Sequence, residues 1–86
     1  MKKQMDKLIN VGYGNAVMST RIVAIVVPNS APVRRLKDEA KNSGKLIDAT
    51  AGRQTRSVIV TDSDHVVLSS ILSQTLISRL SPEDED

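Results

Sequence analysis

The 86-residue chain contains no cysteine, no tryptophan and no phenylalanine, and Tyr13 is its only aromatic residue. The absence of cysteine excludes disulfide bonds, so a domain this small must gain stability from a metal or from oligomerisation. His65 is the only histidine, and a zinc site would therefore depend on carboxylates, which are rarely the main ligands of structural zinc. We therefore expect no metal and a chain that associates with copies of itself.

Long apolar runs are also missing. The longest, residues 22–27, is the length of a strand and far short of the roughly 20 residues that span a bilayer. The basic start Met1–Lys3 is followed by Gln4 and Asp6, where a signal peptide would have its apolar segment. These features predict a cytoplasmic protein with no membrane partner.

The chain has no recognisable catalytic constellation. With one histidine, no cysteine and no nucleophile elbow, none of its serines has an evident activating base. Gly12 and Gly14 begin a pattern that resembles a nucleotide loop, but Val17 stands at the third glycine position and a strand follows. The sequence predicts no enzyme, no cofactor and no small-molecule substrate.

The segment Asp62-Ser63-Asp64-His65 has two possible interpretations. Two carboxylates beside a histidine could bind a metal, but the segment lies between two β-branched runs, where such residues ordinarily form a hairpin turn. The other ligands that a metal would need are missing. We favour the turn, with His65 as a strand residue whose ring has a hydrogen-bond partner.

The pattern of apolar residues predicts an α+β fold with a small, mostly antiparallel sheet, one central helix and a short C-terminal helix. Ser30 is the expected N-cap of the central helix, with Pro32 in its first turn and Gly44 at its end. The segment 21–27, a nearly continuous apolar run, predicts a strand that is covered on both faces. The other expected strands are 8–11, 16–18, 46–49, 56–61 and 65–68, and the final helix is expected within 72–80.

Charge is distributed unevenly along this single domain. The net charge is +2, yet four of the ten acidic residues form the tail 83–86, and residues 1–82 alone have a net charge of +6. Eight of the basic residues lie between Arg21 and Arg56. Such a basic segment either binds a polyanion or serves only to keep the surface solvated, and charge alone leaves both open.

Three arginines stand out within this basic segment. Arg21 opens the main strand, and Arg53 and Arg56 flank Gln54 and Thr55 in a glycine-containing loop. Guanidinium groups on loops suit phosphate groups and narrow minor grooves. Single-stranded nucleic acid fits less well, because base stacking needs aromatic residues and only Tyr13 is available. Double-stranded DNA is the partner we expect.

Four motifs resemble the RemA family of bacterial extracellular matrix regulatory proteins. They are Gly-Tyr-Gly-Asn at 12–15, Ser-Ala-Pro at 30–32, Leu-Ile-Asp-Ala-Thr-x-Gly-Arg at 46–53 and Asp-Ser-Asp-His at 62–65. The resemblance extends from Leu8 to about Leu80. It implies a transcriptional regulator of biofilm-matrix genes, with a fold similar to LytTR-type DNA-binding domains. It also implies assembly into a ring whose basic outer surface holds the duplex.

The resemblance further assigns DNA contacts to Arg21 and Arg53. Family members have a second arginine directly after the position of Arg53, where this chain has Gln54. Glutamine can donate hydrogen bonds to a phosphate or a base edge but carries no charge, and Arg56 is the candidate that compensates. Pro32 matches the family's proline, which we interpret as structural. The alternative function is a ring-shaped scaffold whose basic surface binds acidic proteins.

Overall fold

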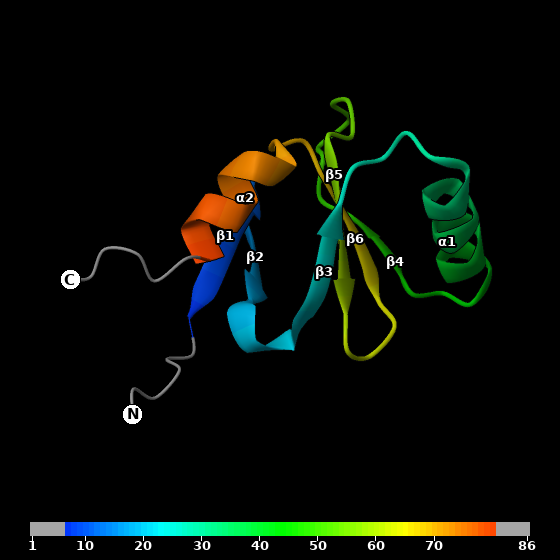
Figure 1. The fold of residues 1–86 in the computed structure, drawn as a ribbon, viewed down its shortest axis with the longest axis horizontal. Helices are drawn as coiled ribbons and strands as arrows, with labels where there is room; N and C mark the ends of the chain where they lie inside the picture. The colour runs from blue at the N-terminus through cyan, green and yellow to red at the C-terminus, as the bar shows by residue number, and fades with distance from the viewer. Residues whose placement is uncertain (1–6, 81–86) are drawn as a thin grey trace.

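The computed structural model describes residues 7–80, so the acidic tail 83–86 lies outside the described residues. These residues form six strands, two α-helices and a short 3-10 helix, η1, and Figure 1 shows how the strands and α-helices are arranged. In chain order they are β1 (Leu8–Gly12), β2 (Asn15–Met18), η1 (Ser19–Arg21), β3 (Ile22–Val26), α1 (Ala31–Asn42), β4 (Leu46–Asp48), β5 (Ser57–Thr61), β6 (Val66–Ser69) and α2 (Ser73–Leu80). The predicted α+β class is confirmed.

The main sheet has four strands in the order β3-β5-β6-β4, and β1 and β2 form a separate antiparallel hairpin. The two central strands are joined by the predicted Asp62–Asp64 turn, and β5 pairs antiparallel with both β3 and β6. β4 instead pairs parallel with β6. The sheet is therefore mostly antiparallel, with one parallel pair at its edge.

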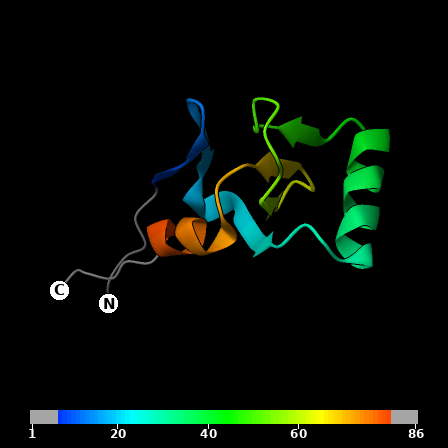
Figure 2. The same ribbon diagram turned by 90° about the horizontal axis from the view of Figure 1, so that it is seen from above.

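Each face of the sheet packs against a different layer (Figure 1). On one face Val58, Val66 and Leu68 pack with Ala40 of α1. On the other face Ile59 and Val67 form a core with residues of the hairpin and with Leu76 of α2. Seen from above in Figure 2, α1 and the hairpin lie on opposite sides of the strands. The β-branched sequence of β5 and β6 follows from this burial on both faces.

Helix α1 begins and ends as the sequence predicts. The Ser30 Oγ accepts a hydrogen bond from the Val33 backbone N–H at 3.3 Å, and Pro32 lies in the first turn. At the other end Gly44, with a φ of +74°, follows the Ser43 C-cap. This positive φ is one that glycine adopts without steric cost, and it lets the chain reverse into β4.

The expectation that residues 21–27 are covered on both faces is only partly right. Ile25 packs on one core and Val26 on the other, but Val23 and Val27 are 66% and 56% exposed. β3 is an edge strand, and its register shifts between Ile22 and Ala24. The extra residue of such a bulge is displaced from the regular alternation, which accounts for the exposure of Val23.

Within residues 7–80, no helix is both long enough and apolar enough to cross a membrane. In the same part of the chain, no group of three or more histidine, aspartate or glutamate side chains is arranged to hold a metal ion.

Candidate nucleic-acid interface

The segment between β4 and β5 begins with a tightly bonded turn. Asp48 Oδ1 accepts hydrogen bonds from the Thr50 hydroxyl at 2.6 Å and from the Thr50 N–H at 2.9 Å. The Thr50 carbonyl in turn accepts a bond from the Arg53 N–H at 3.0 Å. Between them Ala51 and Gly52 have φ values of +54° and +80°. Two consecutive left-handed residues inside a four-residue turn are typical of type I′ geometry, which glycine favours.

The hydrogen bonds from Thr50 also act on the charge of Asp48. They stabilise the carboxylate and lower the pKa of Asp48 below its ordinary value of 3.8; the side-chain bond has the largest effect. Slight burial opposes this shift. Asp48 is therefore ionised at neutral pH and remains an acceptor for both Thr50 donors, which holds the turn before Arg53 in place.

Arg53, Gln54 and Arg56 are all exposed on this segment. The backbone is anchored on both sides of Gln54, because the Arg56 N–H donates to the Ser69 carbonyl at 2.8 Å and the Arg53 N–H closes the turn. In the described part of the chain, only Arg21 and Arg79 use their guanidinium groups in hydrogen bonds or ion pairs. The Arg53 and Arg56 side chains thus project from a fixed backbone with their donors unused.

Arg21 has a different environment. It ends η1 directly before β3, and its Nε donates to Asp62 Oδ1 at 2.7 Å. Both side chains are more than half exposed, so the ion pair is solvated and contributes about 0 to 1 kcal/mol. The Asp62 backbone N–H also donates to the Arg21 carbonyl at 3.0 Å. Arg21 is thereby attached to the turn that follows β5.

The structure does not bring the predicted DNA contacts together within one chain. Arg56 directly precedes β5 and Asp62 directly follows it, so six residue steps separate Arg56 from the partner of Arg21. At about 3.3 Å per residue these positions are roughly 20 Å apart. Arg53, Gln54 and Arg56 form one cluster, and Arg21 lies at the opposite end of the sheet.

The turn at Asp62–Asp64 forms as predicted, and its polar groups bond to one another. The Ser63 Oγ lies 3.0 Å from the Thr61 Oγ1 and 2.7 Å from the His65 Nδ1. The Thr61 Oγ1 also accepts a bond from the His65 N–H at 3.1 Å. The prediction that the His65 ring has a hydrogen-bond partner is therefore confirmed, but His65 is not a strand residue, because β6 begins at Val66.

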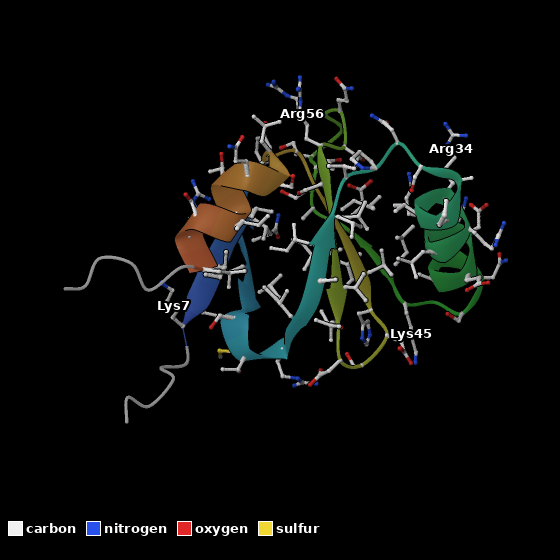
Figure 3. The ribbon with its side chains drawn as sticks, viewed as in Figure 1. Lys7, Arg34, Lys45 and Arg56 are labelled. Atoms are coloured by element: carbon white, nitrogen blue, oxygen red, sulfur yellow. The ribbon has the colours of Figure 1, made fainter. Side chains whose placement is uncertain are left out.

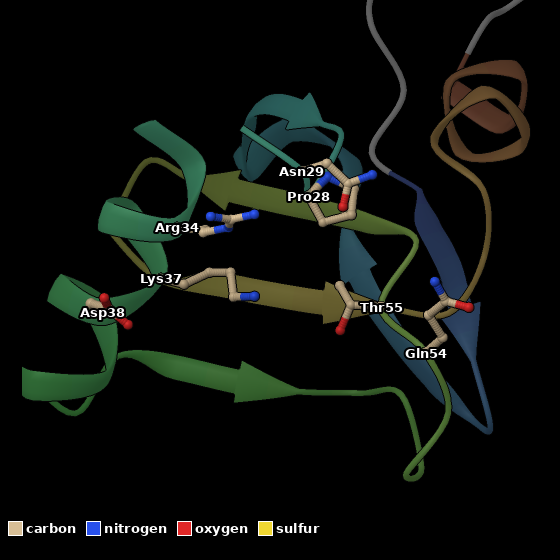
Figure 4. Close-up of a pocket in the computed structure, with 7 residues that line it drawn as sticks. All are labelled: Pro28, Asn29, Arg34, Lys37, Asp38, Gln54 and Thr55. Carbon is tan, nitrogen blue, oxygen red and sulfur yellow. The ribbon is translucent and has the colours of Figure 1, made fainter. Parts of the chain in front are cut away.

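A polar groove of about 470 Å³ adjoins the Arg53–Arg56 cluster. Figure 4 shows Arg34 and Lys37 of α1 extending toward the strands, on the side of the groove opposite Thr55 and Gln54. Lys37 is half-buried and Arg34 is exposed. The groove is lined by Pro28, Asn29, Arg34, Lys37, Asp38, Gln54 and Thr55.

Sequence reasoning did not identify this groove. The sequence does hold one signal for this groove: Arg34 and Lys37 lie three residues apart, and residues with this spacing lie on the same side of a helix. Their proximity to Gln54 depends on how α1 packs against the sheet, and residue spacing does not specify that packing.

Comparisons with known proteins identify the family of this chain. Residues 8–80 match the RemA-like family model, described as extracellular matrix regulatory protein A-like. A protein of Nitratidesulfovibrio vulgaris, named "Putative regulatory protein", is 52% identical over the full length of both chains. Relatives with similar names come from Clostridium botulinum, 58% identical over 92% of this chain and 89% of the relative, and from Geobacillus thermodenitrificans, 54% identical over 94% and 93%. The chain belongs to the RemA-like family of regulatory proteins.

Proposed function

We propose that this protein is a transcriptional regulator that binds double-stranded DNA in the cytoplasm and controls biofilm or extracellular-matrix genes. Its family and the names of its relatives support the regulatory role. The proposal that it acts on DNA rests on the chain's own charge and geometry. The proposed contacts are Arg53, Gln54 and Arg56, together with Arg21 at the other end of the sheet.

The observation that carries this proposal is the unused hydrogen-bonding capacity of the Arg53–Arg56 cluster. Two guanidinium groups and an amide project from a backbone that is held by the Thr50 turn and by Ser69. A fixed backbone reduces the entropy lost when such donors bind phosphates. The cluster also lacks aromatic residues, which agrees with contacts to a duplex backbone more than with base stacking.

The roughly 20 Å between the cluster and Arg21 restricts how one subunit can bind a duplex. A duplex rises about 3.4 Å per base pair, so this separation corresponds to about six base pairs. The two ends of one subunit would therefore contact different phosphates. Several subunits side by side would multiply these contacts along the duplex.

We further propose that the working form is a homo-oligomeric ring with DNA on its basic outer surface. Apolar side chains are exposed on both edge strands of the sheet, with Val23 and Val27 at the β3 edge and Ile47 on β4. Because the β3 and β4 edges differ, the β3 edge of one subunit would contact the β4 edge of the next, which is a heterologous contact. Such contacts close into a ring when the rotation between successive subunits permits it. Light scattering coupled to size exclusion should give a mass above that of a dimer. A single species near the 9.3 kDa monomer mass would contradict the ring.

The direct test of DNA binding is fluorescence anisotropy with a labelled random-sequence duplex over a range of salt concentrations. We expect binding to weaken as the salt concentration rises. Each phosphate contact should add about 0.9 to the slope with which log affinity falls against log salt concentration. Gln54→Arg adds a cation to the cluster and should tighten binding and steepen the slope. An assembled protein that binds no duplex at any salt concentration would contradict the proposal and favour a scaffold for acidic proteins.

A further inference from the structure

The groove between α1 and the Gln54–Thr55 segment has the composition of an anion site. Arg34 and Lys37 provide two positive charges, and Asn29 and Gln54 provide amide donors. Asp38 is the one acidic side chain in the lining, so the groove retains a net positive charge. Among residues 7–80 the structure contains one ion pair, Arg21 with Asp62, so neither Arg34 nor Lys37 is neutralised by Asp38. The charge of the groove is thus available to a ligand.

The lining also indicates which anion fits. A pocket that recognises a nucleobase or another small organic molecule usually has apolar or aromatic walls around a few polar groups. Here Pro28 is the single apolar member of a lining otherwise made of charged and amide or hydroxyl side chains. Such a surface can bind a phosphate group but has no platform for a base. The appropriate ligand is a phosphate recognised through its charge.

The position of the groove connects it to the Arg53–Arg56 cluster. Gln54 lines the groove and also belongs to the cluster, so the two sites share a side chain. In Figure 3, Arg34 and Arg56 lie at the same end of the molecule, whereas Lys7 and Lys45 lie toward the other end. A polyanion that contacts Arg53 and Arg56 would continue past Gln54 into the groove.

We propose that Arg34 and Lys37 bind a backbone phosphate of the same duplex that the Arg53–Arg56 cluster contacts. The inference rests on the proposed function, because it takes duplex DNA as the partner. It adds α1 to the interface, whose other proposed contacts lie on the 53–56 loop and at Arg21 of η1. Lys37 is half-buried, extends toward Thr55 and has no acidic partner among residues 7–80. The proposal explains this arrangement, because a DNA phosphate would be the partner of its ammonium group.

Charge-matched variants on one helix test this proposal. Arg34→Gln and Lys37→Gln each remove a cation from the groove, and Arg35→Gln removes the same charge at the next position, outside the groove lining. We expect Arg34→Gln and Lys37→Gln to lower duplex affinity at least about fivefold more than Arg35→Gln does. Each should also reduce the salt slope by about 0.9 per bound subunit. Circular dichroism melts should coincide for all three, because Arg34 and Lys37 have no side-chain partner among residues 7–80.

Asp38→Asn tests the proposal in the opposite direction, because it should raise duplex affinity where the previous variants lower it. It removes the one negative charge of the groove and should raise duplex affinity severalfold. Glu39→Gln removes the same charge from the adjacent position, which does not line the groove, and should change affinity less. Equal effects of Arg34→Gln and Arg35→Gln, or of Asp38→Asn and Glu39→Gln, would overturn the proposal while leaving DNA binding by the cluster intact.

The source of the phosphate is tested separately by calorimetry with inorganic phosphate and with a mononucleotide. An open groove that holds one phosphate should bind these free ligands only at millimolar concentration. Micromolar binding of either ligand, abolished by Arg34→Gln while duplex affinity is unchanged, would overturn the proposal in favour of a small anionic effector. If the wild-type protein binds no duplex at all, both the proposed function and this inference fail.

Discussion

Polar side chains lie at both ends of β5, but the two ends differ in whether those side chains bond within the chain. At the C-terminal end Asp62 pairs with Arg21, and Ser63 bonds to Thr61 and His65. At the N-terminal end the side chains of the Arg53–Arg56 cluster have no such partner among residues 7–80. Polar side chains that make their hydrogen bonds within the chain stabilise the local turn. Donors left unused on a fixed backbone are available to a ligand.

The largest expected effect is on DNA binding at the N-terminal end. Arg53→Ala should lower duplex affinity more than about tenfold, since each engaged subunit of an oligomer loses one phosphate contact. Arg21→Ala should also weaken binding, but less, because its Nε already donates to Asp62. Anisotropy titrations measure both, and melting temperatures should change little because neither side chain is buried.

Lys41→Ala is a suitable control for these variants, because it removes one exposed charge from the last turn of α1, away from the cluster. If Lys41→Ala weakened binding as much as Arg53→Ala, net charge rather than position would govern affinity. If Arg21→Ala lowered affinity more than Arg53→Ala, the main DNA contact would lie at the C-terminal end of β5 and not at the N-terminal end.

The next effect concerns the turn that positions Arg53. Gly52 has a φ of +80°, and an added Cβ would have no atom within 4 Å, so Gly52→Ala costs only backbone strain. This cost is about 1 to 2 kcal/mol, equivalent to a decrease in melting temperature of several degrees for a domain of this size. We also expect weaker duplex binding, because relief of the strain would displace Arg53.

Gly44→Ala is the matched control, because Gly44 has a φ of +74° and equally open surroundings at the end of α1. Both variants should melt at lower temperatures, as measured by circular dichroism, but only Gly52→Ala should lose DNA affinity. Equal loss of affinity in the two variants would indicate that general destabilisation, not the position of Arg53, is responsible.

A smaller effect is expected from releasing Arg21. Asp62→Asn removes the ion pair but retains the backbone bond from the residue 62 N–H to the Arg21 carbonyl. Stability should change by less than about 1 kcal/mol because the pair is exposed. Duplex affinity should rise a few-fold, since one negative charge is lost beside Arg21. Asp64→Asn removes a charge from the same turn without touching the pair, and a rise as large as that of Asp62→Asn would show that pairing is unimportant.

The local pattern of the sequence was sufficient to predict most of the fold. Ser30 and Gly44 mark the ends of α1, and the Asp62–Asp64 turn joins two β-branched strands, because these features depend on neighbouring residues. The parallel pairing of β4 with β6 was not predictable, since it depends on contacts between distant segments. The exposure of Val23 was missed because a bulge leaves no mark in an apolar run.

The candidate site was predicted only in part, because here too the sequence reveals features that depend on neighbouring residues and not those that depend on contacts between distant segments. Arg53, Gln54 and Arg56 are close in sequence, so their grouping on one loop followed from the chain itself. That Arg21 lies at the far end of β5 is a consequence of strand pairing, which single residues do not encode. The proximity of Arg34 and Lys37 to Gln54 depends on the packing of α1 against the sheet. Such contacts require the three-dimensional structure.

The smallest expected effect is the response of the Thr50 turn to acid. The hydrogen bonds from Thr50 lower the pKa of Asp48 below 3.8, so the carboxylate binds its proton less readily in the folded than in the unfolded chain. The resulting stabilisation is present in full above pH 3.8 and is lost as the pH falls through the lower folded value. The Thr50 amide proton, followed by NMR, should therefore shift with a midpoint below pH 3.8. The shift should disappear in Asp48→Asn, and a midpoint at or above 3.8 would mean that Asp48 does not hold the turn that positions Arg53.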